Sequence, residues 1–539
     1  MPEDFDVLIR GGNVFDGSGG PALTADVAVR GDRIAMVGPA GRARAALEID
    51  ARGMAVAPGF INMLSWAGDD LLVDGRSQSD IRQGVTLEVM GEGSSMGPWN
   101  EAMKRQDLQQ QGDIRYEIAW TTLGEFLDHL VRRGVSTNVA SFVGATTLRV
   151  HEIGHEDRPP RPEELRRMCA LVREAMAEGA MGLASSLIYA PACFADTAEL
   201  VAMARVAAAA GGMYISHIRN EGDRLLEAFE EFLSIARQTG AASEIYHLKA
   251  SGRANWPKLD ALLAGIDAAR SEGLPITADM YPYEASSTGL DTVMPPWVRE
   301  GGHQAWVRRL RDPQVRQRVR REMNDPHGSW DNGYLSAGGP GGILLIAFRQ
   351  EHLKPLTGRT LAQVAAMRGT PPEDTAMDLV IEDDSCVGAV FFSMSEDNIR
   401  RQIRCPWMSF CSDGGSISAE GVFLRRNRHP RTCGAFARLL GRYVRDEKLI
   451  PLEEAVRRLT GLPADNLRLT DRGRLIPGYF ADVVVFDPAT IRDHATYDRP
   501  HQYATGVQEV LVNGVPVIRD GEHTGALPGR VVRGPGWRG

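Results

Sequence analysis

The sequence GGMYISHIRNEGD (211–223) is followed by LLEAFEEFLSIARQTG (225–240), ASEIYHLKASG (242–252), a helical stretch across 257–269, and LPITADMYPYEAS (274–286). Short apolar runs therefore alternate with helical stretches, which is the pattern of successive βα units on a buried parallel sheet. His217, His247 and Asp279 recur at intervals of 30 and 32 residues, about one βα repeat. We expect each at the carboxyl end of a successive strand, the edge at which a (β/α)8 barrel builds its active site.

The same alternation extends through the middle of the chain, from about residue 58 to residue 470. Further strand candidates are GVTLEVMGEG from Gly84, TNVASFVG from Thr137, AMGLASSL from Ala180 and WMSFCSDGG from Trp407. These segments predict an α/β fold whose central sheet is parallel and buried.

One segment, from about residue 295 to 342, departs from this pattern. It holds an arginine-rich helical run, VRRLRDPQVRQRVRREM (307–323), and then a glycine-rich stretch. Connections this long are usually functional lids or disordered. We expect a lid-like insertion, with a solvated helix face as the alternative explanation of the arginines.

Both ends of the chain read as β-structure. Residues 1–57 contain DVLIRGGNVFDG, and residues 471–539 contain GYFADVVVFDP and VQEVLVNGVPVIRDGE, in which Asn513-Gly514 is a strong hairpin signal. Each end alone has too few strands to bury a face. We therefore expect the two ends to meet in one small β-sandwich domain.

Composition excludes several classes of protein. The chain has 539 residues and a formal net charge of −9, so an electrostatic footprint for nucleic acid or an anionic membrane is absent. No apolar stretch approaches the ~20 residues of a membrane span. Six dispersed cysteines without CxxC spacing argue against a disulfide framework. We expect a cytoplasmic protein with no nucleic-acid or membrane partner; whether it forms a homo-oligomer is left open.

Two histidines at the ends of consecutive strands suggest a metal site. A lone histidine there is more often structural, but His217 and His247 can converge on one ion because adjacent strands lie ~4.8 Å apart. Glu92, in VMGEGSS, follows another apolar run and is the candidate third ligand. The alternative is that Glu92 only caps a turn.

Asp413, in FCSDGG, is the candidate proton carrier. It follows an apolar run and precedes two glycines, and a catalytic metal site needs a nearby base for its water. A turn-forming Asp-Gly is the competing explanation. Lys249, two residues beyond His247, is a candidate clamp for an anionic substrate. Tyr281, Tyr283 and Arg431 are weaker substrate-binding candidates, which by themselves would read as surface or packing residues.

Eight motifs, taken in order, resemble one family. They are DVLIRGGNVFDGSG near the start, PGFI (58–61), QGVT (83–86), SHIRNEGD (216–223), HLKASG (247–252), SDGG (412–415), HPRTCG (429–434) and GRLIPGYFADVVVFDP (473–488). Together they are similar to the N-acyl-D-amino-acid deacylase (D-aminoacylase) branch of the amidohydrolase superfamily, over almost the whole chain.

This resemblance implies a distorted, TIM-like (β/α)8 barrel with a small β-sandwich made from both chain ends and a covering insertion. Family members typically hydrolyse the amide of N-acyl-D-amino acids with a zinc ion bound by a cysteine and two histidines. By analogy, His217 and His247 are metal ligands and Asp413 is the general acid/base. Lys249, a tyrosine of DMYPY and Arg431 fall where the family grips the substrate carboxylate.

The sequence departs from the family at three places. The family follows PGFI with a His-x-His pair, whereas Leu64 and Trp66 stand here, so a second metal of the usual kind has lost its ligands. The family cysteine aligns with Gly93, so Glu92 replaces it only if the strand end re-aims the chain by one residue. A Gly-His pair of the family is Gly144-Ala145 here. Asp69 or Asp70 is a candidate for compensating these losses.

The leading hypothesis is a mononuclear zinc amidohydrolase, with one ion per chain, that cleaves the amide bond of small N-acyl amino acids, most simply the D-enantiomers, by metal-activated water. One alternative is an amidohydrolase acting on another linear or cyclic amide or a xenobiotic. The other is a catalytically silent binding protein of the same fold. The sequence leaves open the acyl group, the stereochemistry and the metal, because mixed imidazole and carboxylate ligands suit several ions.

Overall fold

The computed structural model describes residues 4–539, and short parallel strands form its centre. In spatial order these are β6 (Phe60–Asn62), β7 (Val85–Met90), β8 (Asn138–Ser141), β9 (Val143–Gly144), β10 (Gly182–Ser186), β11 (Met213–His217), β12 (Ser243–Ile245), β13 (Ile276–Met280) and β17 (Met408–Phe410). β8 and β9 are consecutive pieces of one strand, separated by Phe142. A parallel bridge between Ser65 and Gly414 joins the segments that follow β6 and β17. The sheet thus closes into the predicted (β/α)8 barrel.

Amphipathic helices surround the barrel. They include α4 (Leu123–Arg133), α5 (Ala145–Glu152), α6 (Pro162–Ala177), α7 (Thr197–Ala209), α8 (Leu225–Thr239), α9 (Lys258–Ser271), α15 (Glu396–Ile403), α16 (Arg431–Arg438), α17 (Leu452–Leu459) and α18 (Gly461–Asn466). In α8, Leu225, Phe229, Phe232 and Ala236 are buried at helical spacing, and Gly240 ends the helix with φ 67°. The sequence pattern thus fixes which face of each helix packs on the strands.

The two chain ends meet in one β domain, as predicted, and their strands belong to a single sheet. β1 (Phe5–Val14), β2 (Leu23–Arg30), β3 (Arg33–Gly38), β4 (Ala45–Asp50) and β5 (Ala55–Pro58) join β18 (Val483–Phe486), β19 (Val507–Val512), β20 (Val515–Arg519) and β21 (Glu522–His523). The junction is the antiparallel pair of β5 and β18, in which Val483 lies opposite Pro58. Asn513 and Gly514 form the expected hairpin turn, both with positive φ.

A separate unit with its own apolar core lies between β13 and α15. Three antiparallel strands, β14 (Ser286–Gly289), β15 (Ile343–Ala347) and β16 (Gly388–Phe391), pack with α10 (His303–Leu310), α11 (Pro313–Met323), α12 (Gly333–Ser336), α13 (Leu361–Arg368) and α14 (Pro372–Asp383). The predicted insertion, 295–342, covers α10 to α12, and these helices share their core with the later elements. We call the whole segment 286–391 the insertion.

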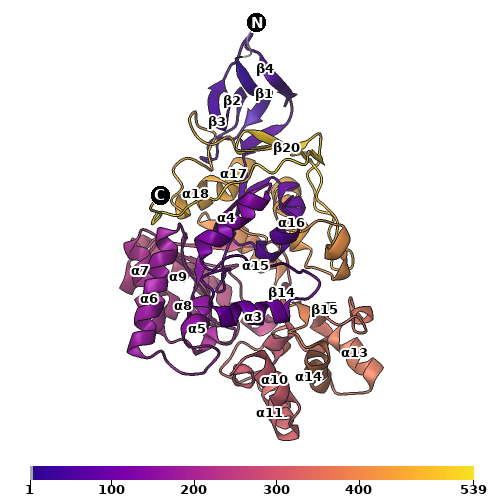
Figure 1. The fold of residues 1–539 in the computed structure, drawn as a ribbon. Helices are drawn as coiled ribbons and strands as arrows, with labels where there is room; N and C mark the ends of the chain where they lie inside the picture. Colours follow the sequence, from indigo (N-terminus) through magenta and orange to yellow (C-terminus); the bar gives the residue numbers. More distant parts are fainter. Residues whose placement is uncertain (1–3) are drawn as a thin grey trace.

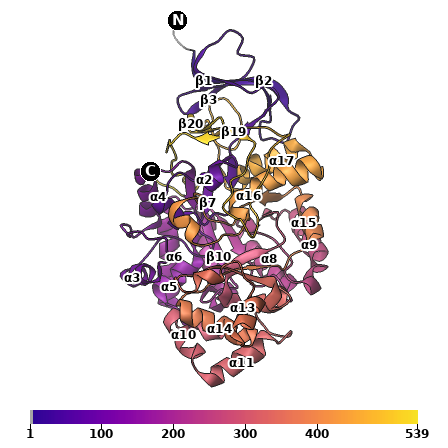
Figure 2. The same cartoon turned by 90° about the vertical axis from the view of Figure 1, so that its right-hand side faces the viewer.

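These three parts follow one another along the molecule. Figure 1 shows the sheet of both chain ends at one end, the barrel in the middle and the insertion, with α10, α11, α13 and α14, at the other end. The view in Figure 2, turned by 90°, shows the same order. Within residues 4–539 we find no helix with the length and apolar character needed to cross a bilayer.

Candidate metal centre and active site

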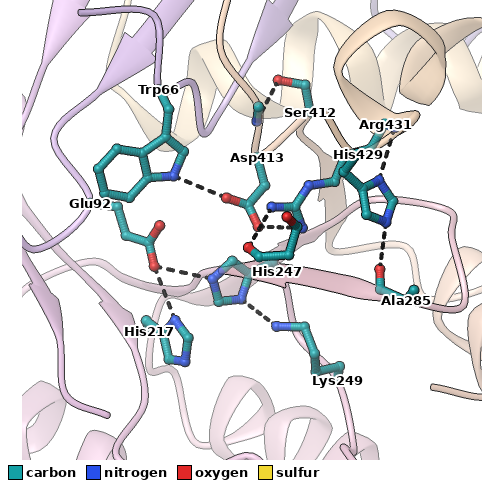
Figure 3. Close-up of polar contacts among 12 residues, drawn as sticks. Trp66, Glu92, His217, His247, Lys249, Ala285, Ser412, Asp413, His429 and Arg431 are labelled. Atoms are coloured by element: carbon teal, nitrogen blue, oxygen red, sulfur yellow. Dashed lines mark hydrogen bonds and ion pairs between the residues drawn. The ribbon is translucent and has the colours of Figure 1, made fainter. Parts of the chain in front are cut away.

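Three side chains converge at the carboxyl ends of β7, β11 and β12. Glu92 Oε1 lies 3.0 Å from His217 Nδ1 and 3.1 Å from His247 Nε2 (Figure 3). All three residues are buried. The structure therefore brings together the three residues that the sequence indicated as metal ligands.

The turn after β7 directs Glu92 into this position. Gly91 and Gly93 have φ of 107° and 63°, a backbone conformation that favours glycine. A Cβ on Gly91 would lie 2.3 Å from Phe142 O, and one on Gly93 would lie 2.5 Å from Ser186 Cβ. The two glycines thus allow the tight turn that points the Glu92 side chain toward His217 and His247.

The donor set suits a divalent cation. Its three ligand atoms lie within 4.8 Å of one another. Ligands of a tetrahedral zinc ion, ~2.0–2.2 Å from the metal, lie roughly 3.3–3.5 Å apart, close to the separations of Glu92 Oε1 from the two imidazole nitrogens. Three protein ligands also leave the open fourth position of a catalytic site.

The carboxylates of Glu92 and Glu221 give this cluster a negative charge that a positive charge between the ligands would stabilise. Burial and the Lys249 ammonium oppose protonation of His247, but the carboxylates of Glu92 and Glu221 outweigh them and raise its pKa to about 10. Burial would raise the pKa of Glu92, yet the imidazoles of His247 and His217 hold it well below its usual value. Either protons on the imidazoles or a metal ion between the ligands can supply the positive charge that the carboxylates demand.

Lys249 lies on the Nδ1 side of the His247 ring, opposite the nitrogen that faces Glu92. Its Nζ donates to Glu221 Oε1 at 2.7 Å and lies 2.7 Å from His247 Nδ1. Glu221 Oε1 is also 3.4 Å from both His247 Nδ1 and His217 Nε2. A substrate carboxylate would have to compete with Glu221 for this ammonium. Lys249 and Glu221 instead contact the imidazoles on the side away from Glu92, where they can fix the orientation of the rings.

Asp413 projects toward the same site from the end of β17. Its Oδ2 is 2.7 Å from Arg431 Nη1, and its Oδ1 accepts a hydrogen bond from Trp66 Nε1 at 3.1 Å (Figure 3). Asp413 has φ 45°, an uncommon conformation for a residue other than glycine. Burial raises the pKa of Asp413 although Arg431 pulls it down. A buried carboxylate with a raised pKa is suited to accept a proton and release it again.

Arg431 is held from several sides. Its guanidinium lies 4.3 Å from the centre of the Tyr281 ring, and its backbone N donates to His429 Nδ1 at 3.0 Å. His429 Nε2 in turn lies 2.9 Å from Ala285 O. Burial and the Arg431 charge lower the pKa of His429 well below its usual range. His429 is therefore a neutral imidazole that donates through Nε2 and accepts through Nδ1.

Tyr281 and Tyr283 have different surroundings. The Tyr281 hydroxyl is buried beside Arg431 and has no hydrogen-bond partner among the described residues. The Tyr283 hydroxyl lies 3.4 Å from Asp493 Oδ2 and 3.5 Å from Pro430 O. The structure thus brings Tyr281 to the site and engages the Tyr283 hydroxyl elsewhere, because the chain turns sharply between them, with Tyr283 N donating to Tyr281 O at 3.0 Å.

A cavity of about 820 Å³ opens onto these groups. Its walls include Glu92, His247, Asp413, Arg431 and Trp66. The insertion contributes the opposite wall through residues of β14, β15 and the start of β16. The insertion therefore covers the site, in keeping with the predicted lid-like role.

Glu221 and His429 contact the site but were not predicted from the sequence as site residues. Both lie inside motifs that were recognised: Glu221 is four residues after His217 in SHIRNEGD, and His429 opens HPRTCG. Asp69 and Asp70 do not join the ligand cluster: Tyr116 donates to Asp69 at 3.1 Å and Arg428 donates to Asp70 at 2.9 Å.

Comparison with known proteins gives consistent matches over the whole chain. A model described as "Amidohydrolase family" matches residues 47–518. The N-acyl-D-glutamate deacylase of Alcaligenes xylosoxydans xylosoxydans is 35% identical over 540 residues, which cover 99% of this chain and 97% of that protein.

Two solved structures have the same fold along their full length. One is N-acyl-D-glutamate deacylase from Bordetella bronchiseptica, complexed with zinc and a phosphonate inhibitor that mimics the tetrahedral intermediate. It has a TM-score of 0.81, 33% identity, and coverage of 98% of this chain and 100% of that one. The other is D-aminoacylase, described with a binuclear metal centre, one-metal activation and second-metal attenuation. It has a TM-score of 0.81, 33% identity and the same coverage.

Proposed function

This chain belongs to the amidohydrolase family, and from that premise we propose that it hydrolyses the amide bond of N-acyl-D-amino acids with one zinc ion held by Glu92, His217 and His247. The observation that carries the proposal is the convergence of these three donors beside a cavity whose walls include Glu92, His247 and Asp413. The substrate class follows that of similar proteins, which are named as N-acyl-D-glutamate deacylase and D-aminoacylase.

Glu92, His217 and His247 would hold the zinc ion, which would supply polarisation of the scissile carbonyl and a lowered pKa for water. Glu92 supplies one negative charge to the ligand set, and His217 and His247 supply neutral imidazoles. Glu221 accepts from Lys249 and faces both rings, so it keeps the imidazoles oriented toward Glu92.

Asp413 moves the proton in this reaction. As a carboxylate it takes a proton from the attacking water, and as a carboxylic acid it gives that proton to the departing amide nitrogen. The raised pKa of Asp413 favours the first step, because it makes the carboxylate a stronger base toward the attacking water. Arg431 keeps Asp413 in place through its contact with Oδ2.

Arg431 and Tyr281 are positioned to bind the substrate carboxylate. Arg431 Nε is buried without a hydrogen-bond partner among residues 4–539, and the same holds for the Tyr281 hydroxyl. Buried donors without partners are costly, so an anionic group that accepts from them would be bound well. This arrangement supports an N-acyl amino acid over an uncharged amide.

Two measurements test the proposal. A panel of N-acetyl-D-amino acids, their L-enantiomers and cyclic imides should show turnover with the D-series; turnover of the imides alone would refute the substrate class, and no turnover at all would favour a binding protein. Elemental analysis should find one zinc per wild-type chain and a large loss in Glu92→Ala. Full zinc content in Glu92→Ala would remove Glu92 from the ligand set.

A further inference from the structure

Trp66 lies directly against the proposed proton carrier. Its indole Nε1 donates to Asp413 Oδ1 at 3.1 Å, while Arg431 Nη1 approaches Asp413 Oδ2 at 2.7 Å (Figure 3). Each carboxylate oxygen therefore has one protein partner, which is neutral at Oδ1 and charged at Oδ2.

The backbone fixes the place of this indole. Asp413 N donates to Leu64 O at 3.0 Å, and Trp66 N donates to Gly414 O at 2.8 Å. The segments 64–66 and 413–414 thus run side by side in a single register, joined by the Ser65–Gly414 bridge. Although 46% of Trp66 is exposed, these backbone hydrogen bonds fix its main chain, and its indole N–H points to Asp413.

An indole N–H can donate a hydrogen bond but cannot ligate a cation. Leu64 offers no ligand atom either. Among residues 4–539, the cluster of Glu92, His217 and His247 is the only group of three or more potential ligands that converges closely enough to hold an ion. The side of Asp413 that faces Trp66 is therefore built for a hydrogen-bond donor and lacks the ligands for a metal ion.

We propose that Trp66 is the positioning residue for Asp413: its N–H orients the carboxylate and occupies Oδ1 so that a second cation does not bind there. This inference rests on the proposed function, in which Asp413 moves the proton. It sets the chain apart from the D-aminoacylase that has a binuclear centre and second-metal attenuation. Excess zinc should then leave the turnover of this chain unchanged.

The positioning role is tested with Trp66→Phe, which keeps the aromatic ring and removes the donor. Loss of one hydrogen bond to a charged group should lower kcat roughly tenfold, with KM unchanged because the substrate-binding groups stay in place. Trp537→Phe, at another exposed tryptophan, is the matched control and should behave as wild type. A wild-type kcat in Trp66→Phe, or an effect on KM alone, would overturn the positioning role.

The cation-exclusion role is tested by zinc titration followed by elemental analysis and assay. Wild type should saturate at one zinc per chain and keep its turnover in excess zinc. The double variant Leu64→His/Trp66→His should bind a second zinc and lose turnover as zinc rises. A wild-type chain that takes up two zinc ions would overturn this role. If wild type turned over no N-acyl amino acid, the proposed function would be refuted. The number of zinc ions bound per chain would still show whether Trp66 excludes a second cation.

Discussion

Asp413 offers the clearest prediction at the scale of single residues. Asp413→Asn preserves the shape of the side chain and its contact with Trp66, but the amide cannot accept a proton. General acid–base catalysis contributes about 10²–10⁴-fold, so kcat should fall by that factor while the zinc content stays at the wild-type value. The assay and elemental analysis belong together: wild-type turnover in the variant would refute the assigned role, and loss of zinc would show that Asp413 is a ligand.

The pH profile gives a second prediction for the same residue. Asp413 must be ionised to take a proton from water, and burial raises its pKa above the ordinary 3.8. Activity should therefore be lost as the pH falls through a value higher than 3.8, and Asp413→Glu should move the midpoint of this acidic limb. An acidic limb with the same midpoint in both proteins would assign it to a different group.

Single residues also show how far the sequence alone could go. Spacing on successive strands placed His217 and His247 correctly, because the carboxyl ends of neighbouring parallel strands meet at one edge. The position of Glu92 depends on the positive φ of Gly91 and Gly93, which a sequence does not display. The contact of Trp66 with Asp413 joins residues 347 positions apart, and no local pattern indicates it.

At the scale of elements, a buried ion pair joins two helices of the barrel. Arg149 of α5 donates to Glu199 of α7 at 2.6 Å, with 1% of each side chain exposed. Glu199→Gln would leave the guanidinium without its counter-charge and should destabilise the chain by about 3–5 kcal/mol. Glu382→Gln removes the partner of Arg368 in a pair that is 23% and 40% exposed, and should cost about 1 kcal/mol or less. Equal urea midpoints for the two variants would contradict this difference.

A buried carboxyl on β12 should make stability depend on pH. Burial and the nearby Asp279 raise the pKa of Glu244 to about 8, although Thr277 and Asn466 donate to it. The folded state thus holds this proton more tightly than the unfolded chain does. The stabilisation is complete below about pH 4.5 and is lost as the pH rises toward 8, by about 1.4 kcal/mol per pH unit at most.

Glu244→Gln removes this titration and keeps an oxygen that can accept from Thr277 and Asn466. Denaturation midpoints of wild type and variant, compared from pH 5 to pH 8, should therefore diverge with rising pH in favour of the variant. A constant difference across this range would mean that Glu244 titrates normally.

The insertion shows the limit of sequence reasoning for elements. The barrel strands were predicted because each one alternates locally with a helix. The sheet of the insertion pairs Ser286 with Phe391, and such antiparallel pairing across about a hundred residues has no signal in spacing. The sequence therefore located the departure from the barrel pattern but not the full extent of the unit.

At the scale of the whole molecule, the last residues tie the parts together. Gly529 N donates to Val135 O at 2.8 Å, Val532 N donates to Val139 O at 2.9 Å, and Arg530 Nη1 lies 2.6 Å from Asp32 Oδ2. The segment 528–534 thus runs along the barrel beside β8 while holding the sheet of the two chain ends. The sequence predicted that both ends meet in one small β-sandwich domain, and the structure shows that the chain continues past the shared sheet to the barrel.

A substitution at Gly529 tests whether the packing of segment 528–534 on the barrel stabilises the molecule. A Cβ on Gly529 would lie 2.0 Å from Thr137 O, so Gly529→Ala must push segment 528–534 away from the barrel. Overpacking of this kind costs roughly 1–3 kcal/mol, and the thermal midpoint should fall accordingly. Gly112→Ala is the matched control, because nothing lies within 4 Å of its added Cβ, and it should change stability by less than about 0.5 kcal/mol. If both variants unfold at the wild-type temperature, the packing of segment 528–534 on the barrel does not help to hold the sheet and the barrel together.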